Sequence, residues 1–254
     1  MANLIQKNNG SSVPEPDNSG SKKTAILFLL SAIVCGVIYI ATESIFPIIL
    51  GGILLVVASI IWFVSITSGA SFTSAKKRYG DAGERQTGYM LEQILPDGYT
   101  IVQNAVVTYQ DGQSEIDNIV IGKTGVFIIE VKNMKGDIYG DYESRYWLQD
   151  KTDRYGIEHK KEFYSPVKQV GTHIFRLANY LRDNKISTHI SGAVYFVNPE
   201  TDAIIKGEPK DIPVFDYDST QEMINYIMNG NANLSGRTVE RIIQLLNEKT
   251  DMIS

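Results

Sequence analysis

Two long apolar runs near the start of the chain constrain most strongly what it can fold into. Residues 24–42 and residues 45–66 contain no Asp, Glu, Lys or Arg. A helix as long as the first run spans roughly 28 Å, which is close to the thickness of a bilayer core. We therefore predict a transmembrane helical hairpin over residues 24–68. The polar residues 1–23 that precede it predict a disordered tail, because they offer too little apolar surface to bury.

Basic residues flank this hairpin on both sides. Lys22 and Lys23 precede the first run, residues 76–78 read Lys-Lys-Arg, and the only charge between the runs is Glu43. By the positive-inside rule, we expect a two-span protein of the cell membrane with both termini and the soluble domain in the cytoplasm. The same basic residues predict contact with anionic membrane lipid. The alternative is a cleaved signal peptide followed by one span; it is disfavoured because no clear cleavage site follows the first run.

The rest of the chain alternates between helical and strand patterns. After a juxtamembrane linker at 69–78, residues 79–254 are expected to form one domain, and a first helix should stop at the turn signal Pro96-Asp97-Gly98. Strands are predicted over 100–109, 114–122, 126–133, 136–150, 190–199 and 211–218, and helices over 165–184, 219–230 and 235–249. This order predicts an α/β fold with a mixed sheet flanked by helices.

Composition limits the partners and the chemistry. Residues 1–70 hold three of the 24 basic and three of the 29 acidic residues, so the remainder carries the net charge of −5. The soluble part therefore has no overall basic footprint for nucleic acid, and any such contact must use a local patch. The chain has one cysteine, Cys35, which excludes an intrachain disulfide and a cysteine metal cage.

Three charged residues stand in apolar, strand-like sequence. Glu130 and Lys132 are two residues apart, so their side chains share one face of a strand. The turn at 123–125 returns the preceding strand beside them, which brings Asp117 close to Glu130. Two adjacent carboxylates repel each other, and a hard divalent cation such as Mg²⁺ relieves that conflict. The pattern is typical of a phosphodiester-hydrolysis site in which Lys132 orients water or stabilises charge on a phosphate.

The motifs "GDAGERQTGYML" and "SEIDNIVIGKTGVFIIEVKNMKGDIYG", followed by a tryptophan, resemble the nuclease-related domain, NERD. That family is similar to the restriction-endonuclease-like PD-(D/E)xK superfamily, so the resemblance implies that fold. It also implies a Mg²⁺- or Mn²⁺-dependent nuclease site, with Asp117 as the aspartate and Glu130 and Lys132 as the E-x-K element. Glu84 corresponds to a helix glutamate near the metal and Gln169 to a polar position on a later helix. Ile116 stands where a proline would precede the aspartate, as is usual for NERD-like sequences.

Two main functional hypotheses follow from these patterns, beside a third in which the chain is a structural membrane protein whose fold merely descends from nucleases. The first is a membrane-anchored nuclease in which Asp117, Glu130 and Glu84 bind the metal, acting on DNA rather than RNA. The second is a non-catalytic, membrane-tethered module that binds nucleic acid or a protein. For Asp117, Glu130 and Lys132 the structural alternative is an ion pair at the end of a sheet.

Other polar positions carry weaker signals. The structural alternative for Glu84 is a solvated residue in the first turns of a helix, and for Gln169 a polar residue at a helix start. A basic and aromatic run over residues 145–168 is either a nucleic-acid-contacting edge or a solvated loop. His159, His173 and His189 show no metal-binding spacing and receive no role.

Overall fold

The computed structural model describes residues 1–6, 59, 79–110, 112–153, 155–209 and 211–248. Apart from Ser59, the predicted membrane hairpin at 24–68 lies outside these residues, and so does the predicted linker at 69–78. Within the described ranges, no helix is long and apolar enough to cross a membrane.

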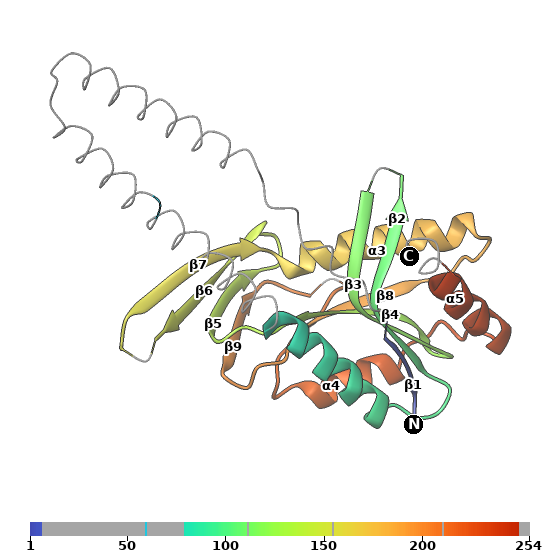
Figure 1. The fold of residues 1–254 in the computed structure, drawn as a ribbon, viewed down its shortest axis with the longest axis horizontal. Coiled ribbons are helices and arrows are strands. Elements are labelled where there is room, and N and C mark those ends of the chain that lie inside the picture. Colours follow the sequence, from blue (N-terminus) through green and yellow to red (C-terminus); the bar gives the residue numbers. More distant parts are fainter. Residues whose placement is uncertain (7–58, 60–78, 111, 154, 210, 249–254) are drawn as a thin grey trace, which may run out of the picture. The chain divides into compact units, whose positions relative to one another are not determined.

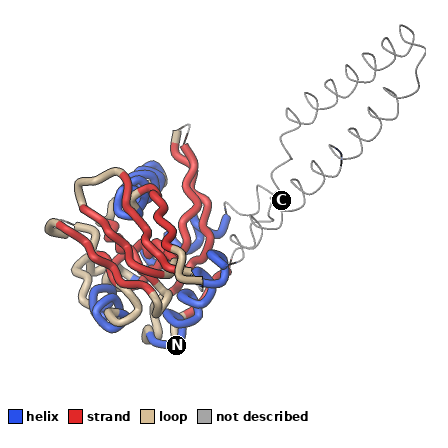
Figure 2. The backbone as a smooth tube through the Cα atoms, turned by 90° about the vertical axis from the view of Figure 1, so that its left-hand side faces the viewer, coloured by secondary structure: helices blue, strands red, loops and turns tan. Residues whose placement is uncertain are grey.

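A six-stranded mixed sheet forms the centre of the domain (Figure 2). Its strands, in spatial order, are β1 (Asn3–Gln6), β2 (Thr100–Tyr109), β3 (Gly112–Gly122), β4 (Gly125–Lys132), β8 (Ile190–Phe196) and β10 (Val214–Phe215). The pairs β2–β3 and β3–β4 are antiparallel, whereas β1–β2, β4–β8 and β8–β10 are parallel. The strand β8, between β4 and β10, is mostly apolar and almost entirely buried, as expected for a strand covered on both faces.

Helices cover both faces of this sheet. Alternate residues of β4 point to opposite faces, so Ile128 packs in a cluster with residues of α3 (Pro166–Asp183) and α5 (Gly236–Glu248). Its neighbour Ile129 packs on the other face, in a cluster with residues of the helix at 79–94 and of α4 (Thr220–Met228). The helix at 79–94 is drawn in teal in Figure 1. The predicted α/β fold, with a mixed sheet flanked by helices, is confirmed.

Local sequence sets the start of α3 and the end of the helix at 79–94, whereas the Ser/Thr cap expected for α4 is not confirmed, because the Ser219 side chain makes no cap hydrogen bond. The hydroxyl of Ser165 accepts a hydrogen bond from the backbone N–H of Lys168, and Pro166 is the first residue of α3. The helix at 79–94 ends just before Pro96, and Gly98 adopts a positive φ of 93° in the turn that leads into β2.

A second, four-stranded sheet has the order β7-β6-β5-β9. It contains β5 (Gly136–Asp141), β6 (Tyr146–Thr152), β7 (Glu158–Tyr164) and β9 (Thr201–Lys206). The strand pair predicted over 136–150 corresponds to β5 and β6. Sequence patterns did not indicate β7, whose residues are almost all exposed and mostly charged, nor the short strand β9.

Part of the tail predicted to be disordered over residues 1–23 is ordered. Asn3–Gln6 form β1, which pairs with Thr100–Gln103 of β2. Ala2 is buried, and Leu4 packs against the cluster that contains Leu91 and Tyr99. These few apolar side chains are enough to order residues 1–6, because β2 already offers a sheet edge with which β1 can pair.

Candidate functional site

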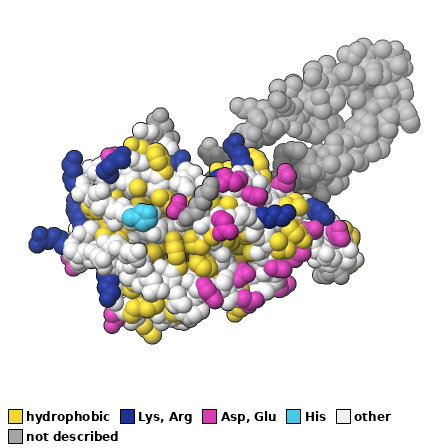
Figure 3. All heavy atoms as spheres, turned by 180° about the vertical axis from the view of Figure 1, so that it is seen from behind, with side chains coloured by type: hydrophobic (Ala, Val, Ile, Leu, Met, Phe, Trp, Pro, Cys, Tyr) yellow, Lys and Arg dark blue, Asp and Glu magenta, His cyan; other side chains and the backbone are white. Residues whose placement is uncertain are grey.

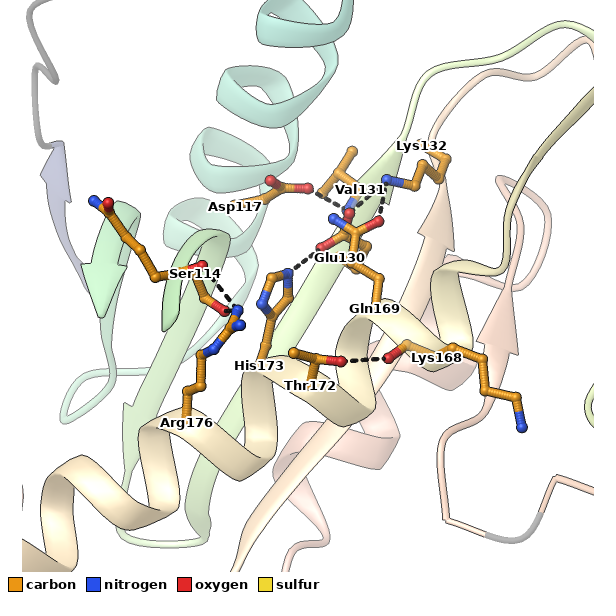
Figure 4. A network of polar contacts seen from close by, with 11 residues as sticks. Ser114, Asp117, Glu130, Val131, Lys132, Lys168, Gln169, Thr172, His173 and Arg176 are labelled. Atoms are coloured by element: carbon orange, nitrogen blue, oxygen red, sulfur yellow. Dashed lines mark hydrogen bonds and ion pairs between the residues drawn. The ribbon is translucent and has the colours of Figure 1, made fainter. Parts of the chain in front are cut away.

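The site lies where β3 separates from β4. The backbone ladder between these strands ends at the pair Asn118 and Ile129. One residue further, Asp117 Oδ2 accepts a hydrogen bond of 2.8 Å from the backbone N–H of Val131 (Figure 4). On β2, Asn104 stands opposite Asp117, drops out of the ladder and has a positive φ of 53°, a conformation that Asn tolerates better than most residues. The Asp117 side chain thus replaces a missing backbone partner of β4.

Glu130 and Lys132 lie on the same side of β4 and contact each other. Lys132 Nζ donates a hydrogen bond of 2.5 Å to Glu130 Oε1 and a second, of 3.2 Å, to Gln169 Oε1. The Glu130 side chain is 1% exposed and that of Lys132 is 22% exposed. The acid is therefore inside the protein and the amine reaches towards solvent, at the carboxyl end of a strand parallel to β8, where open α/β sheets usually bind ligands.

This contact shifts the pKa of both partners. Burial acts to raise the pKa of Glu130, but its interactions with His173 and Lys132 outweigh burial and lower it. Burial acts to lower the pKa of Lys132, but the charges of Glu130 and Asp117 outweigh it and raise the pKa. At neutral pH the pair is therefore fully ionised.

The pKa values of the other two carboxylates, Asp117 and Glu84, are raised. Burial, followed by the charges of Glu130 and Glu84, raises the pKa of Asp117 well above its usual value. Burial, followed by the charges of Asp81 and Glu130, raises the pKa of Glu84 to about 7. The backbone carbonyl of Glu84 accepts a hydrogen bond of 2.8 Å from Gln103 Nε2, which ties its helix to β2. Thus Asp117, Glu130 and Glu84 are near enough to repel one another.

His173, to which the sequence patterns assigned no role, lies beside Glu130. Its buried Nε2 is 3.3 Å from Glu130 Oε2, but the approach lacks hydrogen-bond geometry, so neither atom has a hydrogen-bond partner among the described residues. The spacing of four residues that places His173 on the same face of α3 as Gln169 was the available signal. Arg176, three residues on, donates to Ser114 Oγ at 2.7 Å and holds α3 over β3 (Figure 4).

The basic and aromatic run over 145–168 is divided between surface and interior. Trp147 is buried and Phe163 packs against the same core, so neither offers a ring to a ligand. Lys160 forms an ion pair of 3.2 Å with Asp150, and Arg154 lies outside the described residues. On the face drawn in Figure 3, acidic side chains are scattered among basic and hydrophobic ones. Within the run itself, Lys160 and His159 pair with Asp150 and Asp153, so acidic side chains offset part of its positive charge.

Fold and site together define an α/β domain with carboxylates and a lysine gathered at the carboxyl end of a central strand. Residues 79–197 match the family model described as the nuclease-related domain, NERD, which supports the resemblance noted in the sequence. The chain is also 39% identical over 97 residues to an uncharacterized protein of Bacillus anthracis; the match covers 37% of this chain and 43% of that relative. No solved structure matches the chain significantly.

Proposed function

We propose that this protein hydrolyses phosphodiester bonds of nucleic acid with the help of a divalent cation, Mg²⁺ or Mn²⁺. The observation that carries the proposal is the contact of Lys132 with Glu130 at the point where Asp117 bridges the separating strands. An acid, an amine and a second acid held in this way are the groups that a restriction-endonuclease-like site uses. Gln169 holds the amine in place by accepting its second hydrogen bond.

The donor set fits a hard cation. Glu130 Oε2 is buried and has no hydrogen-bond partner among the described residues, and the raised pKa of Asp117 records repulsion as well as burial. Asp117 and Glu130 would hold the ion and Glu84 would support it, with water completing the shell. No group of three or more His, Cys, Asp or Glu in the described ranges is already arranged as a metal site. When bound, the cation would supply Lewis-acid stabilisation of a phosphate oxygen.

Lys132 is the residue that we assign to the reacting phosphate. Its ammonium carries a charge at neutral pH and is partly exposed, so it can donate a hydrogen bond to a phosphate oxygen or orient a water beside it. Glu130 keeps the amine in position, and the ammonium retains its positive charge, which can interact with the single negative charge of a phosphodiester. We propose DNA rather than RNA as the substrate.

Membrane anchoring is the second part of the proposal. The uncharged runs at 24–42 and 45–66, with basic residues on either side, support a two-span anchor at the cell membrane and contact with anionic lipid. A cytoplasmic domain follows from that charge distribution. Such an anchor would confine hydrolysis to nucleic acid that comes close to the membrane.

The full-length chain tests the catalytic proposal. Purified protein is incubated with single- and double-stranded DNA and RNA, with Mg²⁺, Mn²⁺ or chelator. Glu130→Gln and Lys132→Ala should each reduce cleavage by about a hundredfold or more, the usual cost of losing one charge-stabilising group. The exposed residues Glu158 and Lys123 provide matched controls, Glu158→Gln and Lys123→Ala, that should retain activity. Cleavage that both active-site variants retain in full would refute the assignment.

A non-catalytic membrane-tethered module is the second candidate. It is favoured by the ion pair that already satisfies Lys132 and by the acidic balance of the soluble part. Such a module would bind nucleic acid or a protein and would not bind metal at Asp117. Calorimetry distinguishes the two candidates: binding of Mn²⁺ that disappears in Asp117→Ala excludes the module.

A further inference from the structure

The first residues of the chain are built into the same sheet as the candidate site. The backbone N–H of Asn3 donates to the carbonyl of Tyr99 at 2.9 Å, and that of Ala2 donates to the carbonyl of Glu92 at 3.2 Å. From Asn3 to Gln6 the strand β1 then runs parallel to β2 in continuous register, Asn3 beside Thr100 and Gln6 beside Gln103. Figure 1 shows β1 along the edge of the sheet, next to the N-terminus.

This strand covers an edge that the fold otherwise leaves open. Ile101, Val102 and Gln103 of β2 are fully buried, and β3 pairs with β2 on its other side only. Without β1, the outer backbone groups of these residues would form an unpaired edge next to apolar side chains, which is unfavourable in water. Residues 1–6 therefore act as a structural strand of the domain.

The pairing restricts the path of the chain between β1 and the helix at 79–94. Both flanks belong to one compact unit, and a strand that is hydrogen-bonded to its neighbour cannot be separated from it by a bilayer core about 30 Å thick. We infer that residues 1–6 and residues 79–248 lie on the same side of any membrane that the chain enters, which requires an even number of crossings between them. The sequence contains two runs of spanning length, so both cross or neither does. The biological meaning of this inference rests on the proposed membrane anchor. The pairing of β1 with β2 does not depend on that anchor.

A disulfide cross-link in the full-length chain tests the inference. In a Cys35→Ser background, Asn3→Cys and Thr100→Cys place two cysteines on neighbouring, register-matched strands, about 4.8 Å apart and within disulfide range. Mild oxidation of isolated membranes should link them within one chain, as peptide mass spectrometry would record. Asn3→Cys with Glu158→Cys, on β7 of the second sheet, is the control and should not link. Absence of the first cross-link, or a link that joins two chains, overturns the inference.

Sidedness provides an independent measurement. Asn3 and Glu158 are both exposed, so Asn3→Cys and Glu158→Cys, made singly, should react with a membrane-impermeant maleimide from the same side of sealed vesicles. Labelling from opposite sides overturns the inference. Failure of the anchor itself is seen separately, as protein that does not sediment with membranes; the cross-link then still tests the strand. Loss of nuclease activity affects neither readout.

Discussion

The carboxylate of Asp117 accepts the hydrogen bond of the Val131 backbone N–H at 2.8 Å, in place of the strand partner that β4 has lost. The same side chain is therefore both a structural acceptor and a candidate metal ligand. Burial and the two neighbouring carboxylates make Asp117 costly to ionise. The negative charge that a metal would need is therefore unfavourable in the metal-free protein, whereas the hydrogen bond to Val131 is favourable. These two roles can be separated by substitution.

Asp117→Asn and Asp117→Ala should differ in stability but not in metal binding. Asn retains an oxygen for the Val131 N–H, whereas Ala leaves this N–H unpaired, which costs about 1–3 kcal/mol. Both variants lose the negative charge and should lose Mn²⁺ binding. Urea unfolding and calorimetry on the full chain measure the two effects. Equal stability of the two variants would show that the hydrogen bond to Val131 contributes nothing.

Removal of the His173 imidazole should raise the pKa of Glu130. The contact at 3.3 Å is among the interactions that hold this pKa down against burial, so in His173→Ala the acid protonates at higher pH. The carboxyl signal of Glu130 followed by NMR during a pH titration measures the change. His159 pairs with Asp153 at the surface, and His159→Ala is the matched control. An unchanged Glu130 titration in His173→Ala would contradict a role for His173.

Glu84 should make the metal-free protein less stable as the pH rises. Its pKa in the folded state is about 7, above the ordinary value of 4.5, so the folded form binds the proton more tightly. Its contribution to stability is complete below pH 4.5 and is lost as the pH rises through 7. Glu84→Gln should remove this loss, on the order of 1–3 kcal/mol at pH 8. The free energy of unfolding measured at several pH values checks this prediction, with Glu158→Gln as the control. A Glu84→Gln variant whose stability falls with pH as steeply as that of the parent protein would argue against it.

Two glycines of one helix should respond oppositely to alanine. A Cβ on Gly88 would lie 2.1 Å from Gln103 Nε2, a buried amide that holds the Glu84 carbonyl, whereas a Cβ on Gly80 would meet nothing within 4 Å. Gly88→Ala should therefore destabilise the protein by about 1–3 kcal/mol. Gly80→Ala should be neutral or stabilise it by up to about 1 kcal/mol. Thermal unfolding of both variants measures the difference, and a tolerated Gly88→Ala would mean that Gln103 moves freely.

Periodic apolar sequence accounts for the parts of the fold that were predicted. The apolar run of β4 and the apolar stripe of α3 are enough to identify these two elements, and Pro166 indicates the first turn of α3. In the site, the two-residue spacing of Glu130 and Lys132 and the short turn before β4 were sufficient to bring both near Asp117.

The missed features depend on contacts between distant segments. β7 is mostly charged and exposed, and only its pairing with β6 makes it a strand. β1 has four residues and depends on the edge of β2, which lies almost a hundred positions later in the chain. The four-residue spacing places His173 on the same face of α3 as Gln169, but its contact with Glu130 depends on how α3 packs across β4, which that spacing does not contain.

The two-residue turn at Lys123 and Thr124 fixes the register that sets Ile129 beside Asn118. One additional residue there would rotate every later side chain of β4 to the opposite face of the sheet, and Glu130 would point at the helix of residues 79–94. An apolar strand would still fold in that position. A single inserted codon would therefore separate Glu130 and Lys132 from Asp117 while the architecture stays the same, so the length of this turn belongs to the proposed site as much as its side chains do.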